Sequence, residues 1–273
     1  MPITVDVTYP ADGVGLIAFA DPPRNFGSGA LAERLLDAVA EVGRAGCRVF
    51  VLASDTPGYF IAHWSLQFIV DRQAALEANG HVAPPPALRI FELISDTPMI
   101  SIAANNGQAW GGGAELSWAC DLRIAAASAT YGQPEVGLGI IPGAGGTTRL
   151  ARLIGPTKCL EMILDGRPIT AAEALQLGAI NKVVPDAELR RAAIDWAAHI
   201  ARWPAWSLEA CKRSFYEGRD LPLDVAGRNE SQIFASMARR ADSIELLRTV
   251  QARYDAGLDS YDAIGLPRPD ASA

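Results

Sequence analysis

The sequence predicts an α/β fold for most of the chain and a helical region after it. Short runs rich in β-branched and aromatic residues alternate with segments of helical periodicity, which is typical of α/β domains. From Asp186 onward the pattern is almost entirely helical. We therefore predict a core over residues 1–195 and a helical C-terminal region over residues 196–273.

The N-terminal elements follow from turn and capping signals. Residues 3–9 and 14–20 are predicted to form two strands of a hairpin, because Pro10-Ala11-Asp12-Gly13 between them is typical of a turn. Ser28 can cap a helix that ends near Ala45. The apolar residues of that helix recur on one face: Leu31, Leu35, Ala38, Val39 and Val42.

Apolar runs and helical periodicity give the next elements. Strands are predicted over three ranges: 48–53, 98–104 and 122–126. Helices are predicted over three others: 65–79, 87–94 and 114–119. The segment His81-Val82-Ala83-Pro84-Pro85-Pro86 is the most loop-like stretch, and Asn105-Asn106-Gly107 is predicted to be a polar turn.

The elements of the second half are marked by proline, glycine and a capping box. A helix over 147–154 is followed by one over 156–164, which begins with a proline. Thr170-Ala171-Ala172-Glu173 is a capping box, and its helix is expected to end at Gly178. A short strand is predicted over 179–184.

The composition excludes several classes of function. Hydrophobic residues make up 49% and charged residues 20% of the 273 residues, so a sizeable core is possible. The net charge of −7 argues against nucleic-acid and anionic-membrane partners, which need a basic patch. No apolar run reaches the roughly 18 residues of a membrane span. The N-terminus has no basic and apolar targeting segment, so we expect a cytoplasmic protein without a membrane partner.

The cysteines and histidines form no metal-binding pattern. Cys47, Cys120, Cys159 and Cys211 are not paired at metal or redox spacing, and their apolar surroundings predict buried free thiols. The three histidines form no ligand motif. We therefore expect no metal site.

Two carboxylates beside glycine-rich segments are the strongest functional signal. Glu115 follows Gly111-Gly112-Gly113, and Glu135 follows Pro134 in a turn-rich segment. Gly112 is predicted to lie at a helix start, where free backbone N–H groups and the helix dipole can hold an oxyanion. The Glu115 carboxylate can point back to that site, so the pattern indicates proton transfer on a polarised carbonyl. The alternative is a glycine turn that permits tight packing, with both glutamates exposed or capping.

Other glycine motifs are disfavoured. The segment Gly143-Ala144-Gly145-Gly146-Thr147-Thr148 lacks the lysine of a phosphate loop and the third glycine of a dinucleotide fingerprint. No Gly-x-Ser-x-Gly motif occurs in the chain. These observations argue against a Rossmann dehydrogenase and against the common type of serine hydrolase.

The same stretch resembles the signature of the crotonase family, the enoyl-CoA hydratase/isomerase superfamily. The matching residues are Asn106-Gly107, Gly111-Gly112-Gly113-Ala114-Glu115-Leu116, Cys120-Asp121, Tyr131-Gly132-Gln133-Pro134-Glu135, Gly137, Pro142-Gly143-Ala144-Gly145-Gly146 and Arg149-Leu150. The resemblance continues through Gly155, Leu164-Asp165-Gly166, residues 171–178 and Val183-Val184-Pro185. Order and spacing both agree, whereas the N-terminal half and the last part of the chain match more loosely.

The resemblance implies a spiral of ββα units followed by a helical region that assembles the chain into a homotrimer or a dimer of trimers. It also implies that the substrate is an acyl-CoA thioester. Coenzyme A is then part of the substrate, and no cofactor is expected. Two backbone N–H groups hold the thioester oxygen in this family, and they correspond to those of Gly112 and Trp64. Trp64 lies in Phe60-Ile61-Ala62-His63-Trp64-Ser65-Leu66, which departs from the usual Phe-Ser-Ala-Gly-Ala-Asp-Leu at four of seven positions.

Both glutamates match the two acids of the family's hydratases. One carboxylate takes a proton from water, and the other acid delivers a proton to Cα. Isomerases of the family often keep only the acid at the Glu135 position. Because Glu115 is also present, we expect an enoyl-CoA hydratase. The alternatives are an isomerase or another enolate-forming acyl-CoA enzyme, and a non-catalytic acyl-CoA-binding protein.

Further residues are expected to line the substrate site: Ala62, His63, Trp110, Gly111 and Gly143. His63 stands beside the expected donor Trp64, where it is either a proton-transfer group or, as we favour, a packing or hydrogen-bonding residue. Trp64 and Trp110 are expected to flank the acyl pocket, and a plain core role is the alternative for Trp110.

Overall fold

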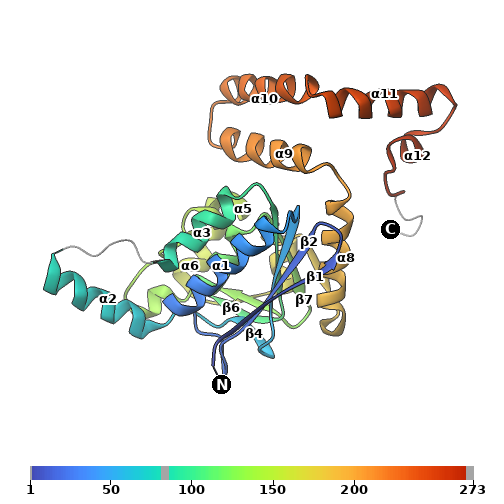
Figure 1. Ribbon diagram of the computed structural model, residues 1–273. Helices are drawn as coiled ribbons and strands as arrows, with labels where there is room; N and C mark the ends of the chain where they lie inside the picture. The colour runs from blue at the N-terminus through green and yellow to red at the C-terminus, as the bar shows by residue number, and fades with distance from the viewer. Residues whose placement is uncertain (1, 81–85, 269–273) are drawn as a thin grey trace. The chain divides into compact units, whose positions relative to one another are not determined.

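The structure described here is a computed structural model that covers residues 2–80 and 86–268 (Figure 1). The predicted linker over residues 81–86 lies outside the described residues, except for Pro86, which begins a helix.

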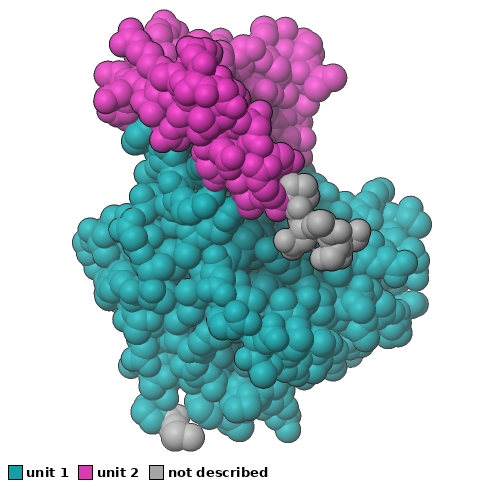
Figure 2. Space-filling view, turned by 90° about the vertical axis from the view of Figure 1, so that its right-hand side faces the viewer, with its two compact units in different colours: residues 1–208 teal, residues 209–273 magenta. Residues whose placement is uncertain are grey.

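The chain divides into two compact units, residues 1–208 and 209–273, which are coloured separately in Figure 2. Every strand of the described residues belongs to the first unit. Residue 195, where the sequence analysis divides the chain, lies within helix α8 (Leu189–Ala201) of that unit.

A six-stranded sheet runs through the first unit in the order β1-β2-β3-β5-β7-β10. β1 is antiparallel to β2, and every other pair is parallel. The strands are β1 (Thr4–Ala11), β2 (Val14–Ala20), β3 (Val49–Ser54), β5 (Ile100–Asn105), β7 (Leu122–Ala126) and β10 (Lys182–Val184). Each of these strands was predicted, although β10 is shorter than the predicted range 179–184. The predicted turn at residues 10–13 is wrong at Pro10 and Ala11, which belong to β1.

A second sheet of four short strands has the order β4-β6-β8-β9. Its members are β4 (Gly58–Ile61), β6 (Gly107–Trp110), β8 (Thr130–Gly132) and β9 (Ile169–Thr170). The predicted turn at Asn105-Asn106-Gly107 is wrong at Asn105, which ends β5, and at Gly107, which starts β6. A Cβ on Gly107 would lie 2.0 Å from the carbonyl oxygen of Gly58, so glycine is needed here because two strands approach closely, not because the chain turns.

Successive strand pairs connect the two sheets. In β3-β4, β5-β6 and β7-β8 the first strand joins the large sheet and the second joins the small sheet. Each pair is followed by helical structure: α2 (Leu66–Asn79) with α3 (Pro86–Asp96), α4 (Gly112–Ala119), and the 3-10 turn η1 (Glu135–Leu138). The expected spiral of ββα units is therefore confirmed.

The capping signals place the other helices of the core. The Ser28 hydroxyl accepts from the Leu31 N–H at the start of α1 (Gly29–Arg44), as predicted. Thr170 and Glu173 form the predicted capping box of α7 (Ala171–Gln176). Between them lie α5 (Arg149–Ile154) and α6 (Pro156–Asp165). α5 starts two residues later than predicted, because Gly145 has φ +132° and its carbonyl accepts from the Thr148 and Arg149 N–H groups in a turn.

The chain after β10 is helical, as predicted. The 3-10 turn η2 (Asp186–Glu188) leads into α8, and four helices follow: α9 (Ala205–Gly218), α10 (Leu223–Ala238), α11 (Ala241–Asp255) and α12 (Ser260–Ile264). None of the helices in the described part of the chain combines the length and apolar composition needed to cross a bilayer.

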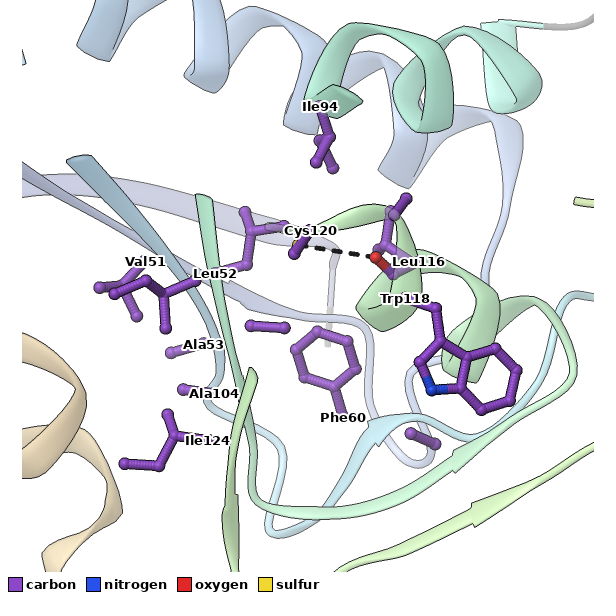
Figure 3. Close-up of a cluster of buried hydrophobic side chains, with 14 of the residues drawn as sticks. Val51, Leu52, Ala53, Phe60, Ile94, Ala104, Leu116, Trp118, Cys120 and Ile124 are labelled. Carbon is purple, nitrogen blue, oxygen red and sulfur yellow. Dashed lines mark hydrogen bonds between the residues drawn. The ribbon is translucent and has the colours of Figure 1, made fainter. Parts of the chain in front are cut away.

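The core of the first unit is built around β3, whose six residues are all buried. α1 packs on β1 and β2, and α8 packs on β2, β3 and β5. Figure 3 shows the part of the core where Phe60 meets residues of the large sheet, Leu116 of α4 and Cys120 at the end of that helix. Fully burying a side chain such as Phe60 contributes about 1.5–3 kcal/mol. This packing fixes the strand ends from which the site residues project.

Three of the four cysteines are buried, as expected. Cys47, Cys120 and Cys159 lie in the core, and none of them forms a disulfide within the described residues. Cys211 forms no disulfide there either but is exposed, so the expectation of a buried thiol is wrong for it. It is exposed on α9, which its apolar neighbours in the sequence did not indicate.

Candidate active site

The Gly111–Gly113 turn carries the chain from β6 into α4, and its glycines permit close contacts. Gly111 has φ +51°, and a Cβ there would lie 2.8 Å from Oε1 of Glu135. A Cβ on Gly113 would lie 2.1 Å from the carbonyl oxygen of Ile61. Because neither contact is compatible with a side chain, glycine is what lets α4 begin against β4 and beside the Glu135 carboxylate.

The two expected oxyanion donors, Gly112 and Trp64, are neighbours. A Cβ on Gly112 would lie 2.9 Å from Cε3 of Trp64 and 3.2 Å from its Cβ. Gly112 is the first residue of α4, so its N–H has no intrahelical acceptor. Within the described residues, neither of the two N–H groups donates to a protein acceptor. Both are therefore free to donate to a ligand oxygen at the start of a helix.

The loop between β2 and α1 holds the segment around Trp64. The Gly27 N–H donates to the His63 carbonyl at 2.9 Å, and the Ser65 N–H donates to the Gly27 carbonyl at 2.8 Å. A Cβ on Gly27 would lie 2.3 Å from Cε3 of Trp64, so the indole lies directly against this glycine. The Trp64 peptide is thus held from both sides while its own N–H remains unbonded.

Glu115 projects from the first turn of α4 into a buried position, where it is 3% exposed. Its Oε1 accepts from the N–H groups of Ala144 and Gly146, each at 2.8 Å. Burial raises the pKa of Glu115, while these backbone bonds and the Arg149 charge act in the opposite direction. The Arg149 guanidinium also donates to the Ala144 carbonyl at 2.8 Å, which fixes the loop that binds the carboxylate.

Glu135 begins η1 and is 7% exposed, so the interpretation of this residue as a surface glutamate is wrong. Burial, and to a lesser extent the negative charge of Glu115, raises its pKa to about 7. The two carboxyls thus interact electrostatically, although they come from different elements. A group with this pKa exchanges its proton readily near neutral pH.

Gln133 is a site residue to which the sequence analysis assigned no role. With its amide nitrogen turned toward Glu135, it donates to Oε2 at 3.0 Å and to Oε1 at 3.2 Å. Gln133 is fully buried and stands two positions before Glu135, within the segment that resembles the family signature. Its position in that segment was the signal by which Gln133 could have been predicted to be a site residue.

His63 makes contacts of a packing and hydrogen-bonding kind. Its Nδ1 lies 2.8 Å from the Trp64 carbonyl oxygen, and its ring centroid lies 4.6 Å from that of Phe26. The Trp64 ring in turn lies 5.6 Å from that of Phe91. These contacts support the interpretation of His63 as a residue that orders the segment around the donor.

The remaining predicted substrate contacts occupy different surroundings. Trp110 donates from Nε1 to the Thr130 hydroxyl at 3.1 Å, which joins β6 to β8 and supports a structural role. Ala62 is buried, and its carbonyl accepts from the Gln108 amide at 3.1 Å. Gly143 is exposed and directly precedes Ala144, the donor to Glu115. Across the described residues, no group of three or more His, Cys, Asp and Glu side chains is placed to hold a metal ion.

A ββα spiral with two unengaged backbone N–H groups beside two buried, interacting carboxyls defines a site of the crotonase type. Such a site can polarise a carbonyl and move protons next to it. The family model described as enoyl-CoA hydratase/isomerase matches residues 10–253. The chain belongs to the enoyl-CoA hydratase/isomerase family.

Comparison with individual proteins agrees with this assignment. The crystal structure of enoyl-CoA hydratase from Bacillus anthracis superimposes with a TM-score of 0.82 and 33% identity, covering 91% of this chain and 96% of that one. The probable enoyl-CoA hydratase 2, mitochondrial, of Arabidopsis thaliana is 34% identical over 72% of this chain and 65% of the relative. The short-chain-enoyl-CoA hydratase of Clostridium acetobutylicum is 44% identical over 49% of this chain and 51% of the relative. The chain thus spans less than two thirds of the length of these two curated relatives.

Proposed function

We propose that the protein is an enoyl-CoA hydratase, which adds water reversibly and with syn geometry to a 2-enoyl-CoA and forms a 3-hydroxyacyl-CoA. The observation that carries the proposal is the pair of buried carboxyls, Glu115 and Glu135, beside the unengaged N–H groups of Trp64 and Gly112. The relatives named as enoyl-CoA hydratases support the same activity.

The two N–H groups have the task of holding the thioester oxygen. When water adds to C3, negative charge moves through the conjugated system to that oxygen and an enolate forms. Backbone donors that are already oriented stabilise this charge without reorganisation, and one such donor accounts for about 10²–10³ in kcat. The position of Gly112 at a helix start adds the positive end of the helix dipole.

The two carboxyls divide the proton transfers. Glu115 accepts two backbone N–H bonds, which favour its charged form, so it takes the proton from water as the water oxygen bonds to C3. Glu135 has a pKa of about 7 and can hold a proton near neutrality, so it delivers a proton to C2 as the enolate collapses. Proton exchange with solvent then restores the starting pair. The reaction moves only water and protons, so we propose no cofactor beyond the coenzyme A of the substrate.

The isomerase alternative requires only one acid that shuttles a proton between two carbons, and it gives Glu115 no task. A panel of thioesters separates the two: 2-enoyl-CoA, 3-enoyl-CoA and malonyl-CoA, each with product identification. We expect the absorbance of the conjugated 2-enoyl thioester to fall as the 3-hydroxyacyl product forms. Conversion of 3-enoyl-CoA without any hydration of 2-enoyl-CoA would contradict the proposal.

We also propose a homotrimer or a dimer of trimers, in which the C-terminal helices form subunit contacts. Large apolar side chains of α10 and α11 are exposed in the single chain: Phe234 at 71%, Ile244 at 36%, Leu246 at 46% and Leu247 at 61%. Covering them on assembly would remove apolar surface from water. Light scattering at micromolar concentration tests this, and a monomer would contradict it. The cytoplasmic location expected from the sequence remains part of the proposal.

A further inference from the structure

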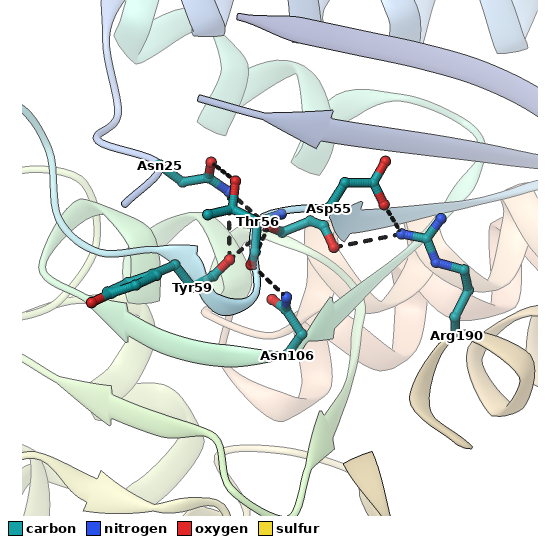
Figure 4. A network of polar contacts seen from close by, with 7 residues as sticks. Asn25, Asp55, Thr56, Tyr59, Asn106 and Arg190 are labelled. Atoms are coloured by element: carbon teal, nitrogen blue, oxygen red, sulfur yellow. Dashed lines mark hydrogen bonds and ion pairs between the residues drawn. The ribbon is translucent and has the colours of Figure 1, made fainter. Parts of the chain in front are cut away.

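Asn25 is fully buried in the loop between β2 and α1 and has φ +50°. This left-handed conformation is uncommon for residues with a Cβ, and asparagine adopts it more readily than most. Burying a side-chain amide is costly unless its groups are hydrogen-bonded. Asn25 takes no part in the proton transfers proposed above, yet it lies within the polar network shown in Figure 4.

The Asn25 amide uses both its nitrogen and its oxygen. Nδ2 donates to the Ser54 hydroxyl at 2.7 Å and to the Phe60 carbonyl at 2.9 Å. Oδ1 accepts from the Thr56 hydroxyl and from the Asp21 N–H, the latter at 2.6 Å. One side chain thereby ties the loop after β2 to the end of β3 and to β4.

The same loop is hydrogen-bonded to the segment that carries the Trp64 donor. The Ala62 N–H donates to the Asn25 carbonyl at 3.2 Å, and the Gly27 N–H donates to the His63 carbonyl at 2.9 Å. The His63 carbonyl and the Trp64 N–H belong to the same peptide unit. The bond from Gly27 therefore sets the direction of the Trp64 N–H and polarises it as a donor.

The network also reaches the segment that leads to the second donor. Nδ2 of Asn106 donates to the Thr56 carbonyl at 2.9 Å. Asn106 stands directly before β6, and β6 runs into the turn that presents Gly112. Thr56, which donates to Asn25 and accepts from Asn106, thus connects the supports of both N–H groups.

We propose that Asn25 is a positioning residue that orients the Trp64 N–H toward the thioester oxygen. This role rests on the proposed function, because it presumes that a thioester carbonyl binds between the two donors. Catalysis by such donors depends on their orientation before the reaction. A displacement of about 1 Å at a catalytic group can lower the rate on the order of 10²-fold. Loss of the Asn25 amide should therefore lower kcat while leaving coenzyme A binding, and with it KM, nearly unchanged.

Asn25→Gly is the main test variant, since glycine tolerates the positive φ and the substitution removes only the side-chain hydrogen bonds. Thr56→Val is the milder one, because it keeps the shape and removes the hydroxyl bond to Oδ1. Ser101→Ala is the matched control: Ser101 is also fully buried and hydrogen-bonded, to Asp121 at 2.8 Å, but it lies outside this network. Each variant is measured for kcat and KM with a short 2-enoyl-CoA and for thermal stability. The carbonyl stretching frequency of a bound ¹³C-labelled thioester is measured by difference infrared spectroscopy.

We expect the wild type to shift the carbonyl stretch to lower frequency than in the free thioester. Asn25→Gly should reverse part of that shift and lower kcat on the order of 10²-fold, and Thr56→Val should do the same to a smaller extent. Ser101→Ala should lose stability without either change. A loss of stability in Asn25→Gly with an unaltered carbonyl frequency would overturn the proposal. If Asn25→Gly does not fold, the Thr56→Val result decides in the same way. Absence of any shift or hydration in the wild type would instead refute the proposed function on which this role rests.

Discussion

Glu135→Gln should stabilise the protein above neutral pH while it removes most of the hydration activity. Glu135 is 7% exposed, and its folded-state pKa of about 7 lies above the ordinary value of 4.5, chiefly because of burial and also because of the Glu115 charge. Glutamine has nearly the same shape but cannot ionise. The substitution therefore isolates the free-energy cost of holding a charge at this position.

The sign of the effect follows from proton binding. Between pH 4.5 and about 7 the folded carboxyl keeps its proton while the unfolded one has lost it, so the folded state binds more protons. The free energy of unfolding of the wild type must then decrease as the pH rises through this window, and the full stability of the protonated form is present only below it. The difference between 4.5 and about 7 corresponds to at most about 3 kcal/mol above pH 7.

Chemical denaturation at pH 5 and pH 8 measures this difference directly. Relative to wild type, Glu135→Gln should gain about 2.5 kcal/mol more at pH 8 than at pH 5, because a small part of the penalty is already present at pH 5. Glu33→Gln is the control, since Glu33 is exposed on α1. An equal stability difference between Glu135→Gln and wild type at both pH values would refute the reasoning. It would mean that ionisation of the buried Glu135 carboxyl does not lower the free energy of unfolding.

Three other substitutions test the remaining parts of the site. Glu115→Gln should lower kcat for hydration at least about 10²-fold with little change in KM, and near-normal turnover would contradict its role as a base. Gly113→Ala should cost about 1–3 kcal/mol in denaturation and also reduce activity, because its Cβ would lie 2.1 Å from the Ile61 carbonyl oxygen. Gly137→Ala, where a Cβ meets nothing within 4 Å, should be close to neutral in both measurements. Trp64→Ala should keep activity on at least one substrate but change the order of preference in an acyl-chain panel, because the proposed donor is main chain.

The large sheet and the capped helices could be predicted because their signals are local. β2 and β3 are apolar runs of strand length, and Ser28 and Thr170 stand at the expected offsets before helical segments. The small sheet could not be predicted, since its strands are only two to four residues long. β6 begins with Gly107. A side chain at this position would clash with Gly58, a residue far away in the sequence.

The site shows the same division between local and distant causes. The start of α4 at the triple glycine and the inward direction of Glu115 follow from helix geometry, which the sequence analysis used. The burial of Glu135 was not predicted, because a glutamate after a proline in a turn is usually exposed. Its surroundings are Gly111, Gln133 and the Glu115 charge, which only the folded chain brings together.

The environments of the two carboxyls differ enough to give them different tasks. The loop at Ala144 to Gly146 offers two N–H donors to Glu115, and Arg149 anchors that loop through the Ala144 carbonyl. Glu135 accepts from the Gln133 amide, and burial together with the Glu115 charge raises its pKa to about 7. In the proposed mechanism the carboxyl that accepts the two N–H bonds holds its charge and the other holds its proton, which is the arrangement that water addition across a double bond requires. Since charge on one raises the pKa of the other, the pair resists double ionisation and stays poised for one proton transfer in each direction.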